Sequence, residues 1–399
     1  MNTRRYLFLQ GPMGPFFKKL AAFLRKQGHY TLRINFNGGD RLHFSSRHAT
    51  DYLGTLADWP AYIHSLIQTH QITDLVLYGD CRPLHQIAIE QARQNHLRTH
   101  VFEEGYFRPN WVTLEADGVN GFSRLPVDAA FYRALPEPPE FVQPPLYGSS
   151  FPRLVRHTIS YYVASFILGW RYLHYKSHRP RTYQKEGPAW GLRLIENYLL
   201  TPFRLRRKRH ALADPRPYFL VLLQLGGDSQ ITHHSRYNDM YEFLDELLSN
   251  FSKHAPPDIR LIVKNHPLDN GLARYRHFLR QKAHTLGLGD RLVYLDAGHL
   301  PTLLKSARGV VTVNSTGGLA AIYHQIPVKI FGRAVYAMAG LVDTQPLEQF
   351  WHHPQPPDET LFKRFRHYVL QHTQIHGSFY RREGMCDAVH DAAIRLGES

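Results

Sequence analysis

The stretch RYLFLQGPMGPFFKKLAAFLRKQGHYTLRINFNGGD, residues 5–40, decides the fold of this chain. Two apolar runs of strand length, at 5–9 and 30–36, flank an amphipathic run of helical periodicity at 15–28. Glycine-rich turns follow both strand-like runs. A strand, a helix and a strand joined by such turns predict a βαβ unit, in which the two strands are parallel members of one sheet.

The same alternation continues on both sides of one interruption. Further strands are expected at 74–79 and 99–103, with helices at 55–70 and 83–96. From about 130 to 215 the pattern fails, in a stretch rich in proline and basic residues. Beyond it, the expected strands are 218–224, 259–264, 291–295, 309–314 and 327–331, and the expected helices are 238–251, 271–286, 300–306, 317–323 and 358–373.

These patterns predict an α/β protein in three parts. The parts are a Rossmann-like domain at 1–130, a linker with a basic, helical, membrane-facing insertion at 131–215, and a second Rossmann-like domain at 216–399. Two such domains facing each other across a cleft form the GT-B type of fold, which we expect here. In open parallel sheets the functional residues gather at the carboxyl ends of the strands, so candidate site residues are expected there.

Composition is that of a cytoplasmic globular protein with an anionic partner. The sequence has 399 residues, 43% of them hydrophobic, which is enough for two domains with sizeable cores. Its two cysteines, Cys81 and Cys386, form no disulfide framework, and no secretory signal pattern opens the sequence, so a reducing compartment is expected. The formal net charge of +15 favours a membrane, nucleic acid or a charged substrate as partner.

The location of this charge favours a membrane surface. Residues 171–210 hold eleven Lys or Arg against two Glu, and the aromatic, apolar stretch 158–170 precedes them. A helix of that length spans only about 20 Å, short of the hydrocarbon core, so an interfacial or buried helix is expected and not a span. An apolar helix with a basic flank is typical of a monotopic membrane contact. A solvated basic linker is the alternative, and no nucleic-acid partner is expected because no nucleic-acid motif accompanies the charge.

One strand end in the second half carries residues suited to phosphate binding. In GVVTVNSTGGLA, at 309–320, a buried strand leads into Ser315, Thr316, Gly317 and Gly318. A helix is expected to begin there, and its free N–H groups can bind a phosphate that the glycines allow to approach. Ordinary capping of the helix by the hydroxyl residues is the alternative.

Two further strand ends in this half carry polar side chains. VKNHP places Lys264, His266 and Pro267 at the edge of the same sheet, where they can meet a phosphate; a surface Lys–His pair is the alternative. QLGGDSQ places Gln224 and Asp228 in a glycine turn just past another strand. Asp in such a turn is often turn chemistry, but it can also be a carboxylate that attacks an anomeric carbon.

The first half offers carboxylates and glycine turns at its own strand ends. In THVFEEGYFRP, Glu103 and Glu104 point to opposite faces if the strand continues, so one of the two is expected to face the cleft as an acid or base. QGPMGPFF brings Gly11 and Gly14 to the start of a helix, and Asn37 follows the next strand. Helix starts and turns of this kind can bind a ligand in the cleft, and simple tight turns are the alternative.

The series LFLQGPMGPFF, RINFNGGD, FEEGYFRP, QLGGDSQ, KNHP, VNSTGGLAAIYHQIPVKIFG and AVYAMAGLVDTQPLEQFW resembles the capsule polysaccharide biosynthesis and export family, and within it the KpsS/LipB-like retaining β-Kdo transferases. The resemblance implies transfer of the first Kdo from CMP-β-Kdo to (lyso)phosphatidylglycerol, with retention, by a peripheral protein at the cytoplasmic face of the inner membrane. The implied partners are this CMP-sugar donor, an anionic phospholipid acceptor and other capsule assembly proteins. No cofactor besides the donor is implied.

The resemblance also assigns roles to residues. The family's Gln-x-x-x-Asp stretch matches Gln224 and Asp228, which makes Asp228 the implied nucleophile. Its Glu before a Gly matches Glu103 as the implied acid/base, with Glu104 left open, and its His-Pro motif matches His266 and Pro267.

The family's Ser-Thr-x-Gly-Leu motif matches residues 315–319, but Ala320 stands where many relatives have an acidic or larger residue, which leaves one donor contact open. The first domain is then implied to be the acceptor side and the second the nucleotide-sugar side. No paired Asp-x-Asp is present to hold a metal, so no metal is expected.

Two other functions stay open at this point. The same fold could belong to a non-catalytic export or assembly protein that binds the lipid-linked glycan. It could also belong to a transferase that uses another CMP- or UDP-activated sugar, because a fold does not fix a substrate.

Overall fold

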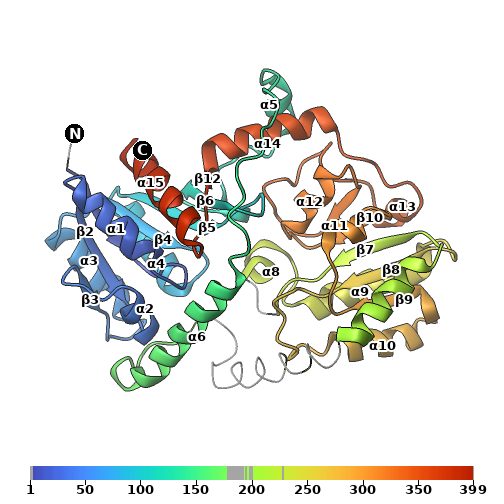
Figure 1. Ribbon diagram of the computed structural model, residues 1–399, viewed down its shortest axis with the longest axis horizontal. Coiled ribbons are helices and arrows are strands. Elements are labelled where there is room, and N and C mark those ends of the chain that lie inside the picture. The colour runs from blue at the N-terminus through green and yellow to red at the C-terminus, as the bar shows by residue number, and fades with distance from the viewer. Residues whose placement is uncertain (1–2, 178–192, 194–195, 197–200, 227–228, 399) are drawn as a thin grey trace. The chain divides into compact units, whose positions relative to one another are not determined.

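The protein consists of two compact units, each built around its own open sheet (Figure 1). The computed structural model describes residues 3–177, 193, 196, 201–226 and 229–398. Unit 1 comprises residues 1–125, 139–178 and 367–399, and unit 2 comprises residues 126–138 and 179–366. The expected fold class, an α/β protein with two Rossmann-like domains, is confirmed.

Unit 1 is built on a seven-stranded sheet of order β12-β6-β5-β4-β1-β2-β3. Strands β3, β2, β1, β4 and β5 run parallel, whereas β6 is antiparallel to both of its neighbours. The strands are β1 (Arg5–Phe8), β2 (Tyr30–Asn35), β3 (Ala49–Asp51), β4 (Asp74–Tyr78), β5 (Arg98–Glu104), β6 (Trp111–Ala116) and β12 (Gln374–His376). The helices are α1 (Phe16–Lys26), α2 (Gly38–His43), α3 (Trp59–Thr69), α4 (Pro83–Gln94), α6 (Phe151–Ile167) and α15 (Arg382–Glu398), with 3₁₀ turns at Asn120–Phe122 and Gly169–Arg171.

The alternation of side chains along β1 builds two cores, one on each face of this sheet. Tyr6 and Phe8 pack on one face with residues of α1 and α15, and Leu7 and Leu9 pack on the other with residues of α3 and α4. Successive strand residues point to opposite faces, so one buried strand supplies both layers. Figure 1 shows α15, near the C-terminus, lying beside α1, near the N-terminus. The last residues of the chain therefore complete the core of the first unit.

Unit 2 has a five-stranded, fully parallel sheet of order β11-β10-β7-β8-β9. Its strands are β7 (Tyr218–Leu222), β8 (Arg260–Lys264), β9 (Leu292–Leu295), β10 (Ala307–Thr312) and β11 (Val328–Ile330). Its helices are α5 (Ala129–Ala134), α8 (Ser229–His234), α9 (Met240–His254), α10 (Tyr275–Thr285), α11 (Leu300–Leu304), α12 (Gly317–Tyr323) and α13 (Leu347–His352), with a 3₁₀ turn at Gly289–Arg291. Helix α14 (Glu359–Thr373) begins in unit 2 and ends in unit 1. Residues 201–213 are also helical.

Each sheet has a switch point, which follows from its strand order. At this point the chain stops adding strands toward one edge of the sheet and continues with strands toward the other edge. In unit 1 this point lies between β1 and β4, and in unit 2 it lies between β7 and β10. Ligand crevices of open α/β sheets form outside the carboxyl ends of the strands at such points. The residues just after these four strands are therefore the first place to look for a site.

Two expectations about the domains need correction. Residues 367–399 were assigned to the second domain, but β12 pairs with β6 and α15 packs on α1, so they belong to unit 1. Residues 131–215 were expected to form one linker and insertion, but 139–178 fold with unit 1 and the remainder with unit 2. Both differences come from long-range packing that local periodicity does not carry.

Of the helix expected at 158–170, residues 158–167 lie in α6, and a 3₁₀ turn at Gly169–Arg171 follows. Among the residues that the structure describes, no helix is both long and apolar enough to cross a membrane.

Candidate functional site

The register of the unit 2 sheet aligns the ends of three strands that carry candidate residues. Leu222 of β7 pairs with Lys264 of β8 on one side and with Thr312 of β10 on the other. Adjacent strands lie about 4.8 Å apart, so these ends form one row of about 10 Å. The polar residues that follow each strand therefore share one edge, as the sequence predicted for Lys264, His266 and Ser315.

The loop after β8 holds the ring of His266 in a fixed tautomer. Leu268 N donates to His266 Nδ1 at 3.1 Å, and His266 N donates to Asn265 Oδ1 at 2.9 Å. Asn265 is itself fixed, since its Nδ2 donates to Asp269 Oδ2 at 3.0 Å. Because Nδ1 accepts a hydrogen bond, the proton of the neutral ring is on Nε2, which can donate to an anion. The exposed Pro267 lies in the same turn.

Lys264 ends β8 as a buried cation. Its Nζ donates to the carbonyl oxygen of Asn265 at 3.1 Å, and its side chain is almost fully buried. Burial lowers the pKa of Lys264, because the charged form loses hydration. A phosphate arriving at this edge would stabilise the ammonium form and raise that pKa again.

Gln224 links the two strands at the unit 2 switch point. Gln224 Nε2 donates to Asn314 Oδ1 at 2.8 Å, and Asn314 N donates to Gln224 Oε1 at 3.2 Å. Both polar atoms of this buried amide thus hold β7 to β10, which gives Gln224 a positioning role. Asp228, the implied nucleophile, lies outside the described residues.

The segment 315–318 is compact and its glycines are needed for packing. Ser315 Oγ accepts from Gly317 N at 3.1 Å, whereas the Thr316 side chain makes no capping hydrogen bond. A Cβ on Gly318 would lie 2.4 Å from the hydroxyl of Tyr336, and one on Gly317 would lie 2.6 Å from Leu222 Cδ1. Both glycines are therefore explained by close packing, and Ser315 by the turn that starts α12.

In unit 1, Glu103 lies at the carboxyl end of β5, beside the loop that follows β4. A Cβ placed on Gly79 would lie 3.4 Å from Glu103 Oε2, which is ordinary contact, and the φ of 69° at Gly79 favours glycine there. Burial is the largest effect on the carboxyl and, with the charge of Glu104, raises the pKa of Glu103 to about 7. A carboxyl group that titrates near neutral pH is suited to accept or donate a proton.

Glu104 has a different environment. Tyr380 Oη donates to Glu104 Oε1 at 3.3 Å, so a residue of the C-terminal segment 367–399 binds this carboxylate. Glu104 N donates to Glu103 Oε1 at 3.0 Å. The two carboxyl groups thus have different hydrogen-bond partners, and the assignment of Glu103 as the acid/base, with Glu104 left open, stays a prediction. Tyr380 could not be predicted from the sequence, because its contact with Glu104 joins residues that are far apart in the chain.

The comparisons with known proteins identify the family. The sequence profile described as "Capsule polysaccharide biosynthesis protein" matches residues 73–380. The capsule polysaccharide export protein KpsS of Escherichia coli is 37% identical over 386 residues, covering 95% of this chain and 98% of that protein. The chain belongs to the capsule polysaccharide biosynthesis family.

A second curated relative agrees with this membership. The capsule polysaccharide modification protein LipB of Neisseria meningitidis serogroup B is 36% identical over 393 residues, covering 95% of this chain and 92% of that protein. Among solved structures, Thermosulfurimonas dismutans KpsC, titled a beta Kdo 2,7 transferase, is 14% identical, covers 98% of this chain and 99% of that chain, and has a TM-score of 0.45.

In this family member the other unit 1 candidates are structural. A Cβ on Gly11 would lie 2.6 Å from the ring of Phe17, and one on Gly14, whose φ is 141°, would lie 3.4 Å from the ring of His157. Asn37 caps α2, because its Oδ1 accepts from Asp40 N at 2.9 Å. These contacts account for the three residues by folding, and their predicted role in ligand binding stays a prediction.

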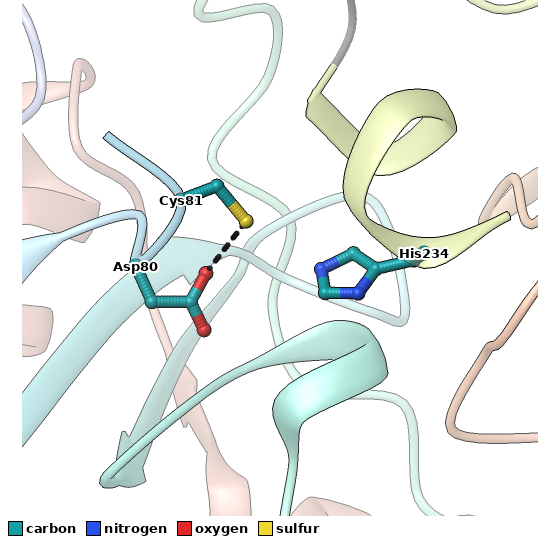
Figure 2. A group of neighbouring side chains, drawn as sticks. All are labelled: Asp80, Cys81 and His234. Carbon is teal, nitrogen blue, oxygen red and sulfur yellow. Dashed lines mark hydrogen bonds between the residues drawn. The ribbon is translucent and has the colours of Figure 1, made fainter. Parts of the chain in front are cut away.

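The loop after β4 lies at the unit 1 switch point and is held by Asp80. Cys81 Sγ donates to Asp80 Oδ1 at 3.2 Å, as Figure 2 shows, and Val119 N donates to Asp80 Oδ2 at 2.8 Å. His234, also drawn in Figure 2, belongs to unit 2, where its carbonyl oxygen accepts from Arg333 N at 2.6 Å. The prediction that the capsule protein needs no metal stays a prediction.

Sequence reasoning missed an aspartate that organises the basic segment of unit 2. Asp296 follows β9 and is nearly buried, with guanidinium groups of Arg193, Arg204 and Arg276 at 3.4, 3.5 and 2.5 Å from its oxygens. Burial opposes its ionisation, but these guanidinium groups offset that effect and the pKa of Asp296 lies below its usual value. Arg204, expected to be a membrane contact, is thus paired inside unit 2.

Proposed function

We propose that this capsule protein is a retaining glycosyltransferase that transfers Kdo from CMP-β-Kdo to (lyso)phosphatidylglycerol and so starts the glycolipid end of a capsular polysaccharide. In the proposed reaction, the Asp228 carboxylate attacks the anomeric carbon and the bond to CMP breaks, leaving CMP as an anion. The acceptor hydroxyl then attacks the same carbon, its proton passes to Glu103, and the bond to Asp228 breaks. Two displacements at one carbon retain the configuration.

One observation carries the proposal. In a member of this family, the carboxyl edge of the unit 2 sheet brings together a cation and hydrogen-bond donors. Lys264 and His266 follow one strand, and Ser315 follows a strand two positions away in the same row. Cationic and N–H donors fixed before the reaction stabilise a departing phosphate without reorganisation. Because CMP is already a good leaving group, no strong general acid is required at this edge.

The acid/base role of Glu103 is supported by its environment in unit 1. A general base works best when its pKa lies near the working pH, and burial raises the pKa of Glu103 to about 7. A Kdo acceptor hydroxyl is a weak acid, so a base with this pKa is a better proton acceptor than an ordinary carboxylate.

The proposed location is the cytoplasmic face of the inner membrane, with the protein bound peripherally and in contact with other capsule assembly proteins. The net charge of +15 and the basic stretch 171–210 support attraction to an anionic leaflet. This positive charge would also attract an anionic phospholipid acceptor.

Mass spectrometry of a fluorescent phosphatidylglycerol analogue incubated with the purified protein tests the proposal. With CMP-Kdo we expect the acceptor mass to rise by one Kdo and CMP to be released in equal amount. Parallel reactions with other CMP- and UDP-sugars test the donor, and a product with one of them in place of CMP-Kdo would overturn the Kdo assignment. Binding of the lipid-linked glycan with no product from any donor would support the non-catalytic alternative.

A further inference from the structure

The amphipathicity of α6 is inverted relative to that of an ordinary surface helix. Its only fully buried residue is Ser165, whereas large apolar side chains point to solvent. The exposed set recurs at helical spacing and continues into the following 3₁₀ turn: Ile159 (59% exposed), Val163 (51%), Phe166 (64%), Ile167 (61%) and Trp170 (70%). A helix that packs on a domain normally buries its apolar stripe and exposes its polar one.

The inner face of α6 is polar because it is fixed by hydrogen bonds to α2. Asn37 Nδ2 donates to Tyr161 Oη at 2.7 Å, and Gly39 N donates to Ser165 Oγ at 3.1 Å. A Cβ on Gly38 would lie 2.2 Å from the carbonyl oxygen of Ala164, so α6 needs glycine at this contact. These contacts determine which way α6 faces, and its apolar stripe cannot rotate inward without breaking them.

The charge around the stripe matches an anionic lipid surface. Residues 141–176 contain no Asp or Glu, and the helix with its flanks carries Arg153, Arg156, Arg171 and Lys176. A second copy of the chain would bring the same basic residues against themselves, since a twofold contact pairs each patch with its own copy. An anionic leaflet offers both an acyl layer for the stripe and negative charge for the flanks.

We infer that the outer face of α6 and the following turn, defined by Ile159, Val163, Phe166, Ile167 and Trp170, is the surface that docks the protein on the membrane. The helix lies in the interface plane, since its 17 residues reach only about 25 Å, which is less than the hydrocarbon core. The inference deepens the proposed function and rests on it, because it names the surface by which the enzyme reaches a lipid acceptor. The apolar part of the expected membrane contact thus belongs to unit 1.

A polar network on the inner face of α6 links this helix to the residues that follow β1 and β2. Gln10, at the β1 end of the switch point, donates through Nε2 to Asp40 Oδ2 at 3.0 Å and to Tyr175 Oη at 3.1 Å. Tyr161 of α6 donates to Asp40 Oδ1 at 3.2 Å, so the docking helix is bonded directly to the carboxyl edge of the sheet.

The test is vesicle binding by a triple variant, Val163→Ser, Phe166→Ser and Ile167→Ser, in the full chain. Vesicles of equal parts phosphatidylcholine and phosphatidylglycerol should pellet the wild type, and the triple variant should partition at least tenfold less. The matched control, Leu56→Ser with Ile394→Ser, changes apolar residues of unit 1 that are 50% and 41% exposed and should bind like the wild type. Wild-type pelleting by the triple variant would overturn the inference.

A second readout reports insertion directly. Acyl chains brominated near the headgroup should quench the fluorescence of Trp170, so the wild type should lose more emission than Trp170→Phe. Equal quenching of the two proteins would overturn insertion at this surface. Gel filtration of the wild type and the triple variant tests whether a second copy of the chain covers the stripe instead. A dimeric wild type with a monomeric triple variant would make the stripe a contact between copies and overturn membrane docking.

The outcome separates this inference from the proposed function. Hydrolysis of soluble CMP-Kdo should be the same in the triple variant and the wild type, because the substituted side chains point to solvent. Loss of vesicle binding with intact hydrolysis supports both proposals. If vesicle binding depends on α6 but the protein shows no activity toward any donor, the inference about the docking surface stands and the proposed transferase function is rejected.

Discussion

The carboxyl edges of the two sheets have opposite electrical character. In unit 1 the strand ends carry paired carboxylates, and burial raises the pKa of Glu103 to about 7. In unit 2 they carry the buried ammonium group of Lys264 and a histidine whose ring proton lies on Nε2. The same architecture therefore carries two different edges, and we propose that the unit 1 edge handles a proton and the unit 2 edge holds an anion.

The difference arises from which polar side chains at the strand ends are hydrogen-bonded to each other and which charged side chains are buried. At the unit 2 switch point, the Gln224 and Asn314 side chains are hydrogen-bonded to each other, and Lys264 at the neighbouring strand end is a buried cation. In unit 1, the carboxylates lie beside tyrosines, and Tyr380 donates to Glu104. Tyrosine hydroxyls support a carboxylate without fixing its charge as an arginine would.

The largest effect is expected at Asp228. Replacing Asp228 by Asn or Ala should lower the rate of Kdo transfer by several orders of magnitude, because the covalent step loses its nucleophile. Melting temperature should stay at the wild-type value, and the exposed Asp258→Asn serves as the matched control in the same unit. Transfer within about tenfold of the wild type would remove Asp228 from the mechanism.

Glu103→Gln should have the next largest effect on the rate of Kdo transfer. Such a loss would support the assignment of the proton acceptor to unit 1. General-base catalysis typically contributes about 10²–10⁴-fold, and a loss in that range is expected. A base acts in its ionised form, so the wild-type rate should rise with pH through about 7. This rise should be absent in Glu103→Gln.

Glu115→Gln is the matched control for that pH profile. Burial raises the pKa of Glu115, on β6, to about 7 as well, but its oxygens accept hydrogen bonds from Tyr106, before that strand, and from Ser123, after it. The rise in rate near pH 7 should persist in this variant. A profile that changes in Glu115→Gln and not in Glu103→Gln would refute the assignment.

His266→Ala and Ser315→Ala should give smaller losses that concern the donor. Each removes a hydrogen bond to a charged group, worth about 1–3 kcal/mol, so KM for CMP-Kdo should rise roughly tenfold or more. His277→Ala, on the exposed side of α10, should leave donor kinetics unchanged. Unchanged kinetics in both site variants would move the nucleotide away from this edge.

The smallest effect on the transfer reaction itself is expected in the basic helix at 201–213, where substitutions should act on membrane binding. Arg204 is paired with Asp296, so the membrane contribution of this segment falls to exposed residues such as Arg206 and Arg209. Each basic residue near an anionic leaflet contributes about 1 kcal/mol, so Arg206→Gln with Arg209→Gln should weaken vesicle binding about thirtyfold at low salt and less at high salt. Equal binding by variant and wild type would make the segment a solvated linker, whereas Arg204→Gln should mainly lower the melting temperature.

The sequence predicted most strands and helices because each has a strong local signal. The apolar run at 5–9 and the amphipathic run at 15–28 became β1 and α1. The position of β12 was not predictable, since a three-residue strand pairs with Trp111–Thr113, more than 250 residues earlier in the chain. Local periodicity carries no information about such a partner.

The candidate site shows the same division. Lys264, His266 and Ser315 could be found because each follows a strand, and parallel strands end at one edge. The raised pKa of Glu103 and the three arginines around Asp296 depend on burial and on residues far away in sequence. The direction that α6 faces was also hidden, because it depends on Gly38 and Gly39 of a neighbouring helix.

Calorimetric titration of CMP into the wild type, His266→Ala and Glu103→Gln tests the division between the two edges most directly. The account predicts that His266→Ala binds CMP about tenfold more weakly, because the phosphate loses a charged hydrogen bond. It predicts that Glu103→Gln binds CMP as the wild type does, although this variant fails to transfer Kdo. Wild-type affinity in His266→Ala, or a loss of affinity in Glu103→Gln as large as the one predicted for His266→Ala, would contradict the account.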